Sequence, residues 1–85
     1  MLSSVKLALR IVSSEFDDEI NDIICAAKAD LTSAGIAYRS TDPLIKRAVI
    51  IYAKAHFGFS EDQEKYGIAY ASMKSLLGII RAVGV

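Results

Sequence analysis

The clearest pattern in the chain is a helical repeat of apolar residues that starts directly after Asp42 and Pro43. Aspartate accepts hydrogen bonds from the free amides of a first helical turn, and proline is favoured at the first helical position. Apolar residues then recur at steps of three and four and leave only a narrow polar strip. Gly58 is suited to the left-handed conformation that ends many helices. The pattern predicts a helix over 43–57 that other parts of the chain cover on most sides.

Three further helices are predicted from similar signals. A short amphipathic helix is expected over 4–11, and it is too short to be stable alone. A longer helix is expected over 15–34, because acidic residues crowd its first turn, where the helix dipole favours negative charge. The last helix is expected over 61–83, where Ser60 and Gln63 have the spacing of a capping box.

The fold class follows from these four helices. No stretch shows the alternation of apolar and polar residues that is typical of a strand, and no internal repeat competes with the helical pattern. We therefore predict an all-α fold, a small four-helix bundle-like arrangement in which residues 1–85 form a single domain. The side chains expected to be among the most buried are Ile24, Leu31, Val49, Tyr52 and Met73.

The last predicted helix carries more apolar surface than one neighbouring helix could cover. After Lys74 it reads SLLGIIRAVGV, in which Arg81 is the only charged residue. Gly67 and Gly78 share a face with other small residues, although glycine inside a helix costs about 1 kcal/mol relative to alanine. We therefore expect another backbone to approach that face closely and a partner chain to cover the apolar surplus.

Composition narrows the possible partners. The chain has 85 residues, 53% of them hydrophobic, and a domain this small has little interior in which to bury them. Ten basic residues balance ten acidic ones, which removes the strongly basic field that non-specific nucleic-acid binding uses. No apolar run approaches the roughly 20 residues of a membrane span, and no signal-peptide pattern is present. We expect a soluble, untargeted chain that is made in the cytosol.

The residues that could carry chemistry do not form a constellation. His56 is the only histidine, and a structural role is expected for it. Cys25 is the only cysteine, so an intrachain disulfide is impossible, and its position beside two alanines indicates a small buried side chain. The helix dipole explains the carboxylates at the start of the second predicted helix better than a metal site does. We therefore expect no enzymatic activity, no cofactor and no metal.

Five segments follow one another along the chain in a distinctive order. They are VKLALRI, FDDEINDII, AAKADLTSAGI, DPLIKRAVIIYAKAHFG and EKYGIAYASMKSLL. Their order and spacing resemble the short head–tail connector proteins of tailed bacteriophages and prophages, which are often labelled DNA-packaging proteins. The resemblance covers nearly the whole chain, and its most specific parts are the blocks at 27–36 and 42–58.

This resemblance implies a structural role in the virion. It implies an all-helical subunit of a ring, twelvefold in the family, that docks under the portal protein, extends the DNA channel and supports head completion and DNA packaging. The implied partners are the portal, other neck proteins and further copies of the chain, while DNA passes through the channel without sequence-specific binding. The implied location is the virion neck at the head–tail junction, after synthesis in the host bacterial cytoplasm. The resemblance is also compatible with a protein that is a monomer when it is free of the virion.

The oligomer contact is predicted on the last helix together with charged faces of the second helix. Head-to-tail contacts between like subunits close into a ring when the rotation permits, and opposite charges fix their register. Acidic residues at the start of the second helix are expected to meet basic residues of the third helix in a neighbouring copy. The candidate interface residues are Asp17, Asp18, Asp22, Lys46, Arg47, Lys54, Leu77, Ile80 and Arg81.

An alternative is a small helical regulator that binds DNA with a helix-turn-helix formed by the second and third helices. Two features oppose it. The connector over 35–41 is longer than the usual turn of that motif, and the third helix offers mostly aliphatic residues where base-reading side chains would be needed.

Overall fold

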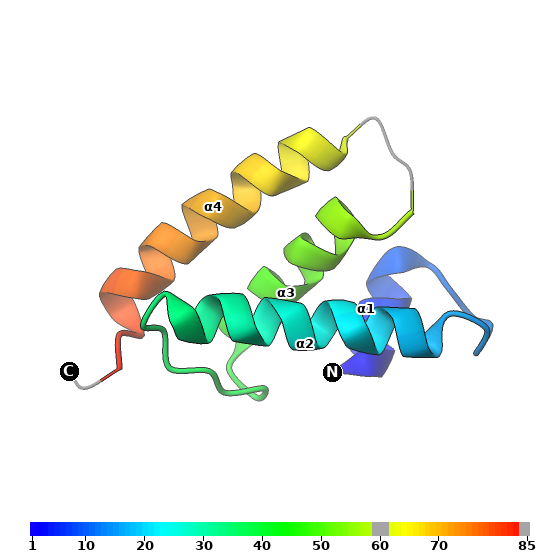
Figure 1. Ribbon diagram of the computed structural model, residues 1–85, viewed down its shortest axis with the longest axis horizontal. Coiled ribbons are helices and arrows are strands. Elements are labelled where there is room, and N and C mark those ends of the chain that lie inside the picture. Colours follow the sequence, from blue (N-terminus) through cyan, green and yellow to red (C-terminus); the bar gives the residue numbers. More distant parts are fainter. Residues whose placement is uncertain (59–61, 84–85) are drawn as a thin grey trace.

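Four helices in succession make up the structure, a computed structural model that describes residues 1–58 and 62–83 (Figure 1). They are α1 (Leu2–Leu9), α2 (Asp17–Ser33), α3 (Pro43–His56) and α4 (Gln63–Ile80). The described residues contain no strand, apart from an isolated antiparallel bridge between Ile36 and Ala82, so the predicted all-α class is confirmed. Each helix begins and ends within about three residues of its predicted bounds, which is the usual scatter for helix ends.

α3 lies at the centre of the fold and packs against all three other helices. Its start follows the predicted cap, because Asp42 Oδ1 accepts a hydrogen bond from the Leu44 amide at 2.9 Å and Pro43 is the first helical residue. Gly58 follows the helix with φ +70°, the left-handed conformation expected of it. The fully buried residues of α3 are Ile45, Ala48, Val49 and Ala53. A helix enclosed in this way holds the other three in place.

The core is one cluster of apolar residues contributed by all four helices and by the connector between α2 and α3. Its members are Val5, Ile20, Ala27, Leu31, Ile36, Ile45, Ala48, Val49, Ala53, Tyr70 and Leu77. Of the side chains predicted to be most buried, Leu31 and Val49 are fully enclosed. Ile24, Tyr52 and Met73 are only partly buried and pack at the edge of the cluster. A domain of this size encloses few side chains completely.

Some local predictions for the first two helices and for the start of α4 need correction. Cys25 is exposed rather than buried, because the enclosed stripe of α2 runs through Ile20, Ala27 and Leu31 and position 25 is turned away from it. α1 ends two residues earlier than predicted, where Arg10 takes a left-handed conformation with φ +60°.

The capping box predicted at the start of α4 involves Ser60, which lies outside the described residues. Gln63 reaches back by another route: its Nε2 donates a hydrogen bond to the Gly58 carbonyl oxygen at 2.7 Å. This bond ties the start of α4 to the end of the α3 segment.

The far end of α4 is fastened to the connector between α2 and α3. The Ala37 amide donates to the Arg81 carbonyl oxygen at 2.7 Å, and the Val83 amide donates to the Gly35 carbonyl oxygen at 2.8 Å. Arg81 Nε also lies 2.6 Å from Asp42 Oδ2, so the carboxylate that caps α3 pairs with the end of α4. Figure 1 shows the end of α4 meeting the end of α2 at one side of the molecule. We call these contacts the C-terminal clamp.

Ile45→Ala should lower the free energy of unfolding by about 2–5 kcal/mol, because Ile45 is fully buried and a small core cannot refill the cavity. Ile51→Ala is the matched control, since Ile51 lies on the same helix but is only partly buried, and a smaller loss is expected. Urea unfolding followed by circular dichroism measures both. Equal losses would contradict the described division between the enclosed and open sides of α3.

Candidate interaction surfaces

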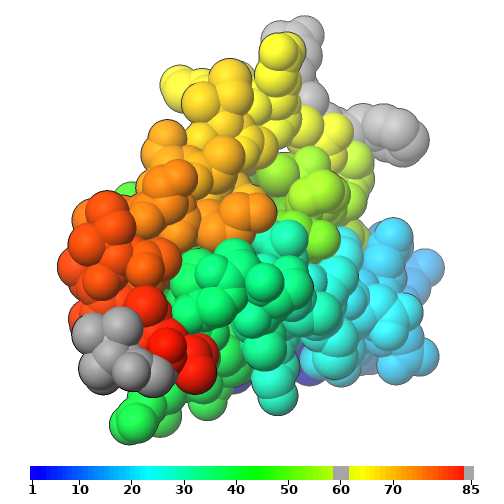
Figure 2. All heavy atoms as spheres, turned by 60° about the vertical axis from the view of Figure 1, so that its left-hand side comes forward, coloured from blue at the N-terminus to red at the C-terminus, as the bar shows by residue number. Residues whose placement is uncertain are grey.

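The outer face of α4 carries large apolar side chains that the rest of the described chain leaves uncovered. We define this α4 outer face by Ile68, Leu76, Ile79 and Ile80, which are exposed by 64, 47, 77 and 43%. The last three are spaced so that they lie together on the helix surface. Figure 2 shows α4 running along the molecular surface toward its C-terminal end. Contiguous exposed apolar surface marks a site of protein interaction more often than scattered single residues do.

The exposed residues of α4 between Gly67 and Ile80 include no charged side chain. Gly67 and Gly78 belong to this surface, and a Cβ atom added at either position would meet nothing within 4 Å. The close approach of another backbone that these glycines predicted therefore does not occur within the described part of this chain. The small residues leave the surface open to a partner.

Two of the interface residues predicted at the end of α4 are engaged within the chain. Leu77 is fully buried and belongs to the core, so its side chain is not available to a partner. The reason is the rotation of α4, which turns Tyr70 and Leu77, one heptad apart, toward α3. Arg81 is held in the C-terminal clamp. Ile80 remains a candidate, and Ile79 joins it because it is the more exposed of the two.

The acidic interface residues predicted on α2 differ in whether their carboxylates are paired within the chain. Asp17 is paired within the chain, with its Oδ1 at 2.7 Å from Lys6 Nζ. Asp18 and Asp22 are exposed on the surface of α2 and remain candidates for an intermolecular contact.

The predicted basic residues come together along a groove between α3 and α4. Lys46, Arg47 and Lys54 line this groove, which has a volume of about 620 Å³. Its other lining residues are Thr41, Pro43, Leu44, Ile50, Ile51, Tyr66 and Ala69. None of the acidic residues that the structure describes lines it. The groove therefore combines an apolar floor with a positively charged rim.

Helix geometry explains how the groove is built. Arg47, Ile50 and Lys54 recur at steps of three and four, which places them on one face of α3. The Nζ atom of Lys54 lies 5.5 Å from the ring centre of Tyr66 on α4, a cation–π contact across the groove. The sequence identifies these cations but not the groove, because the groove also needs the position of α4 beside α3.

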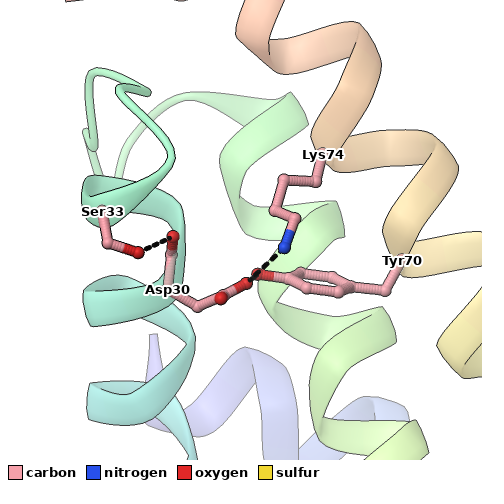
Figure 3. Close-up of polar contacts among 4 residues, drawn as sticks. All are labelled: Asp30, Ser33, Tyr70 and Lys74. Carbon is pink, nitrogen blue, oxygen red and sulfur yellow. Dashed lines mark hydrogen bonds and ion pairs between the residues drawn. The ribbon is translucent and has the colours of Figure 1, made fainter.

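A polar cluster joins α2 to α4 at the edge of the core (Figure 3). Tyr70 donates its hydroxyl hydrogen bond to Asp30 Oδ2 at 2.5 Å, and Lys74 Nζ lies 3.2 Å from the same oxygen. Ser33 Oγ donates to the Asp30 carbonyl oxygen at 2.9 Å. The sequence does not predict this cluster. The periodicity places Asp30 on the polar face of the second helix and Tyr70 among the apolar residues of the last helix, so nothing pairs them.

The cluster changes the acidity of both of its acidic members. The hydrogen bond from Tyr70 is the largest cause that holds the pKa of Asp30 below its usual value, and Lys74 adds to the effect. Burial, reinforced by the bond to Asp30, raises the pKa of the Tyr70 hydroxyl above its usual value. Both shifts favour a neutral tyrosine that donates to an ionised aspartate.

His56 and the cysteine, aspartate and glutamate side chains are the groups that could bind a metal ion in the described part of the chain. His56 is exposed at the end of α3, where its ring centre lies 4.2 Å from that of Tyr52. Over residues 1–58 and 62–83, no three histidine, cysteine, aspartate or glutamate side chains gather closely enough to hold a metal ion. Within the same ranges, no helix has the length and apolar character needed to cross a membrane.

In the part of the chain that the structure describes, the main surface features are an exposed apolar helix face and a basic groove, a combination that is typical of protein-interaction modules. A family model described as "Phage connector protein" matches residues 1–81. The chain therefore belongs to the phage connector family, which confirms the resemblance noted from its segments. Comparisons with curated proteins and with solved structures give no significant match.

Stability should depend on pH in the acid range through Asp30. Its folded-state pKa lies below the ordinary value of 3.8, so the ionised carboxylate stabilises the fold above about pH 4. This stabilisation is lost as the pH falls through the folded-state pKa. Tyr70→Phe removes the largest cause of the shift and should lower the free energy of unfolding at neutral pH by about 1–2 kcal/mol, with a shallower acid dependence.

Chemical unfolding of both proteins between about pH 3 and pH 7 measures this effect. Tyr66→Phe is the matched control, because Tyr66 lies in the groove and should leave the acid dependence unchanged. An acid slope that is the same in Tyr70→Phe and in the parent protein would remove Tyr70 as the cause.

Proposed function

We propose that this chain is a subunit of a head–tail connector ring that docks under the portal protein, extends the DNA channel and supports head completion and DNA packaging. Membership of the phage connector family supports a connector role. The proposal requires no catalytic step, and we assign none to the chain. The observation that carries the assembly part of the proposal is the uncharged, exposed α4 outer face.

The α4 outer face suits another protein surface better than lipid. Leu76, Ile79 and Ile80 stay exposed to water in the isolated chain, which is unfavourable unless a partner covers them. Helices that lie on membranes carry a basic polar face beside the apolar one, and the exposed residues of α4 between Gly67 and Ile80 include no charge. A like subunit or the portal supplies the apolar surface that such a face needs.

The distribution of charge favours a head-to-tail contact between copies. Asp18 and Asp22 are exposed on α2, whereas Lys46, Arg47 and Lys54 line the groove beside α3. Two different, complementary patches on one molecule generate a heterologous contact, which closes into a ring when its rotation permits. A twofold dimer would instead need one self-complementary patch.

The helix-turn-helix alternative fits the fold less well. A recognition helix must present its side chains to a DNA groove, whereas α3 is the central helix and buries Ile45, Ala48 and Val49. The connector before it is also tied to the end of α4 by the C-terminal clamp. We therefore propose that DNA passes through the channel without sequence-specific binding.

A gel shift with duplex DNA should be weak and nearly independent of salt, while a steep salt dependence would favour a regulator.

We place the protein at the virion neck, with the portal and neighbouring neck proteins as partners, after synthesis in the host bacterial cytoplasm. The charged contacts are exposed, and contacts of that kind add little affinity each. The free protein is therefore expected to be a monomer that forms its ring on the portal.

Sedimentation velocity of the protein with and without its portal tests the proposal. We expect a monomer alone and co-sedimentation as a multi-copy ring when the portal is present. A chain that stays monomeric and unbound in both conditions would refute the connector proposal.

Replacing Ile79 and Ile80 together with serine should weaken assembly on the portal by at least about tenfold, because it removes exposed apolar area from the contact. Helical content should be largely retained, since both side chains lie at the surface. Leu7→Ser is the matched control, because Leu7 is 80% exposed on α1 and lies outside the α4 outer face. Equal assembly of the double variant and the control would move the interface away from α4.

A further inference from the structure

We infer that the groove between α3 and α4 is a socket for a second copy of this chain, and that the segment which enters it is the α1–α2 corner, residues 11–19. The inference rests on the proposed function and specifies the contact between neighbouring subunits in the ring. Three properties of the described structure support it: the chemistry of the groove, the chemistry of the corner, and the position of the corner outside the groove of its own chain.

None of the ion pairs between described residues involves the cations of the groove. Lys46, Arg47 and Lys54 line the groove. Its floor is apolar and includes Leu44 and Ile50. A segment that fits this groove has to present carboxylates for the rim and at least one apolar side chain for the floor.

The α1–α2 corner has this composition. Val12 is 100% exposed, and Phe16 is 40% exposed beside it. Glu15, Asp18 and Glu19 are exposed in the same short stretch. A fully exposed valine alone is unremarkable, but here it stands next to carboxylates that match the rim of the groove in charge.

The corner is also held in shape before any partner binds. The ring of Phe16 packs edge to face on that of Phe57, with 5.6 Å between the ring centres. Lys6 Nζ lies 2.7 Å from Asp17 Oδ1, and Ser13 Oγ accepts a hydrogen bond from the Glu15 amide at 3.0 Å. A segment that is already ordered loses less conformational freedom on binding, which makes it a better ligand.

The corner lies outside the groove of its own chain, so the inferred contact joins two copies. Anchoring to Phe57 and Lys6 fixes the corner in its own chain, and none of residues 11–19 lines the groove. In Figure 1 the corner lies at one end of the long axis, whereas the residues that line the groove belong to α3, the turn before it and the first two turns of α4. Because two different patches meet, a corner-to-groove contact is heterologous, as a ring requires.

Nucleic-acid phosphate is the other anion that a basic groove could take. The apolar floor between the cations and the zero net charge of the chain favour a protein segment over a phosphate backbone.

Reciprocal charge reversal tests the contact. Arg47→Glu places a carboxylate in the groove that receives the acidic corner, and Asp18→Arg places a cation in the corner that enters the basic groove, so each variant alone should assemble on the portal at least about tenfold less well. In a mixture of the two variants, every contact of an alternating ring again has opposite charges at positions 18 and 47, and assembly should recover. Lys28→Glu is the matched control, because it reverses an exposed cation of α2 outside both surfaces.

The possible outcomes distinguish an error in the inferred contact from an error in the proposed function. If the parent protein assembles on its portal but the mixture fails to recover, the corner-to-groove contact is wrong and the connector proposal stands. The mixture is also sedimented without portal at high protein concentration, where association of the mixture alone supports the contact even if the parent fails to bind the portal. Salt-sensitive binding of duplex DNA that Arg47→Glu abolishes would overturn the contact in favour of nucleic acid.

Discussion

The enclosure of α3 by the other three helices is the constraint on which this structure depends. With 85 residues the chain can enclose only one helix on most sides, and the fully buried side chains of Ile45, Val49 and their neighbours occupy the space between α1, α2 and α4. The remaining face of α3 must be polar or be covered from outside. That face carries Arg47 and Lys54, and with α4 beside it the basic groove follows.

Local signals were sufficient to predict the helices, because each signal acts within one turn. Asp42, Pro43 and Gly58 set the bounds of α3 through a cap, a fixed φ angle and a left-handed end, and the structure confirms all three. Such signals do not predict how α4 is rotated about its own axis. Leu77 and Ile79 are both apolar and near in sequence, and only packing against α3 decides that Leu77 is enclosed and Ile79 exposed.

The sequence predicts individual residues of the candidate surfaces, but it does not predict the surfaces that these residues form together. The charges of Lys46, Arg47 and Lys54 are visible in the sequence, whereas the groove requires α4 to lie alongside them. The polar cluster shows the same limit more strongly, because Asp30 and Tyr70 are 40 residues apart in the chain. Side-chain pairs at such separations depend on the tertiary arrangement, and periodicity within one helix carries no information about them.

The C-terminal clamp has a mechanical consequence. α4 packs mainly on α3 along its length, and its end is held by two backbone hydrogen bonds and by the pair of Arg81 with Asp42. A pull or push on the outer face of α4 is therefore transmitted at two points, into the enclosed side of α3 and into the connector that precedes it. Because Asp42 also caps α3, strain at the end of α4 acts directly on the first turn of the central helix.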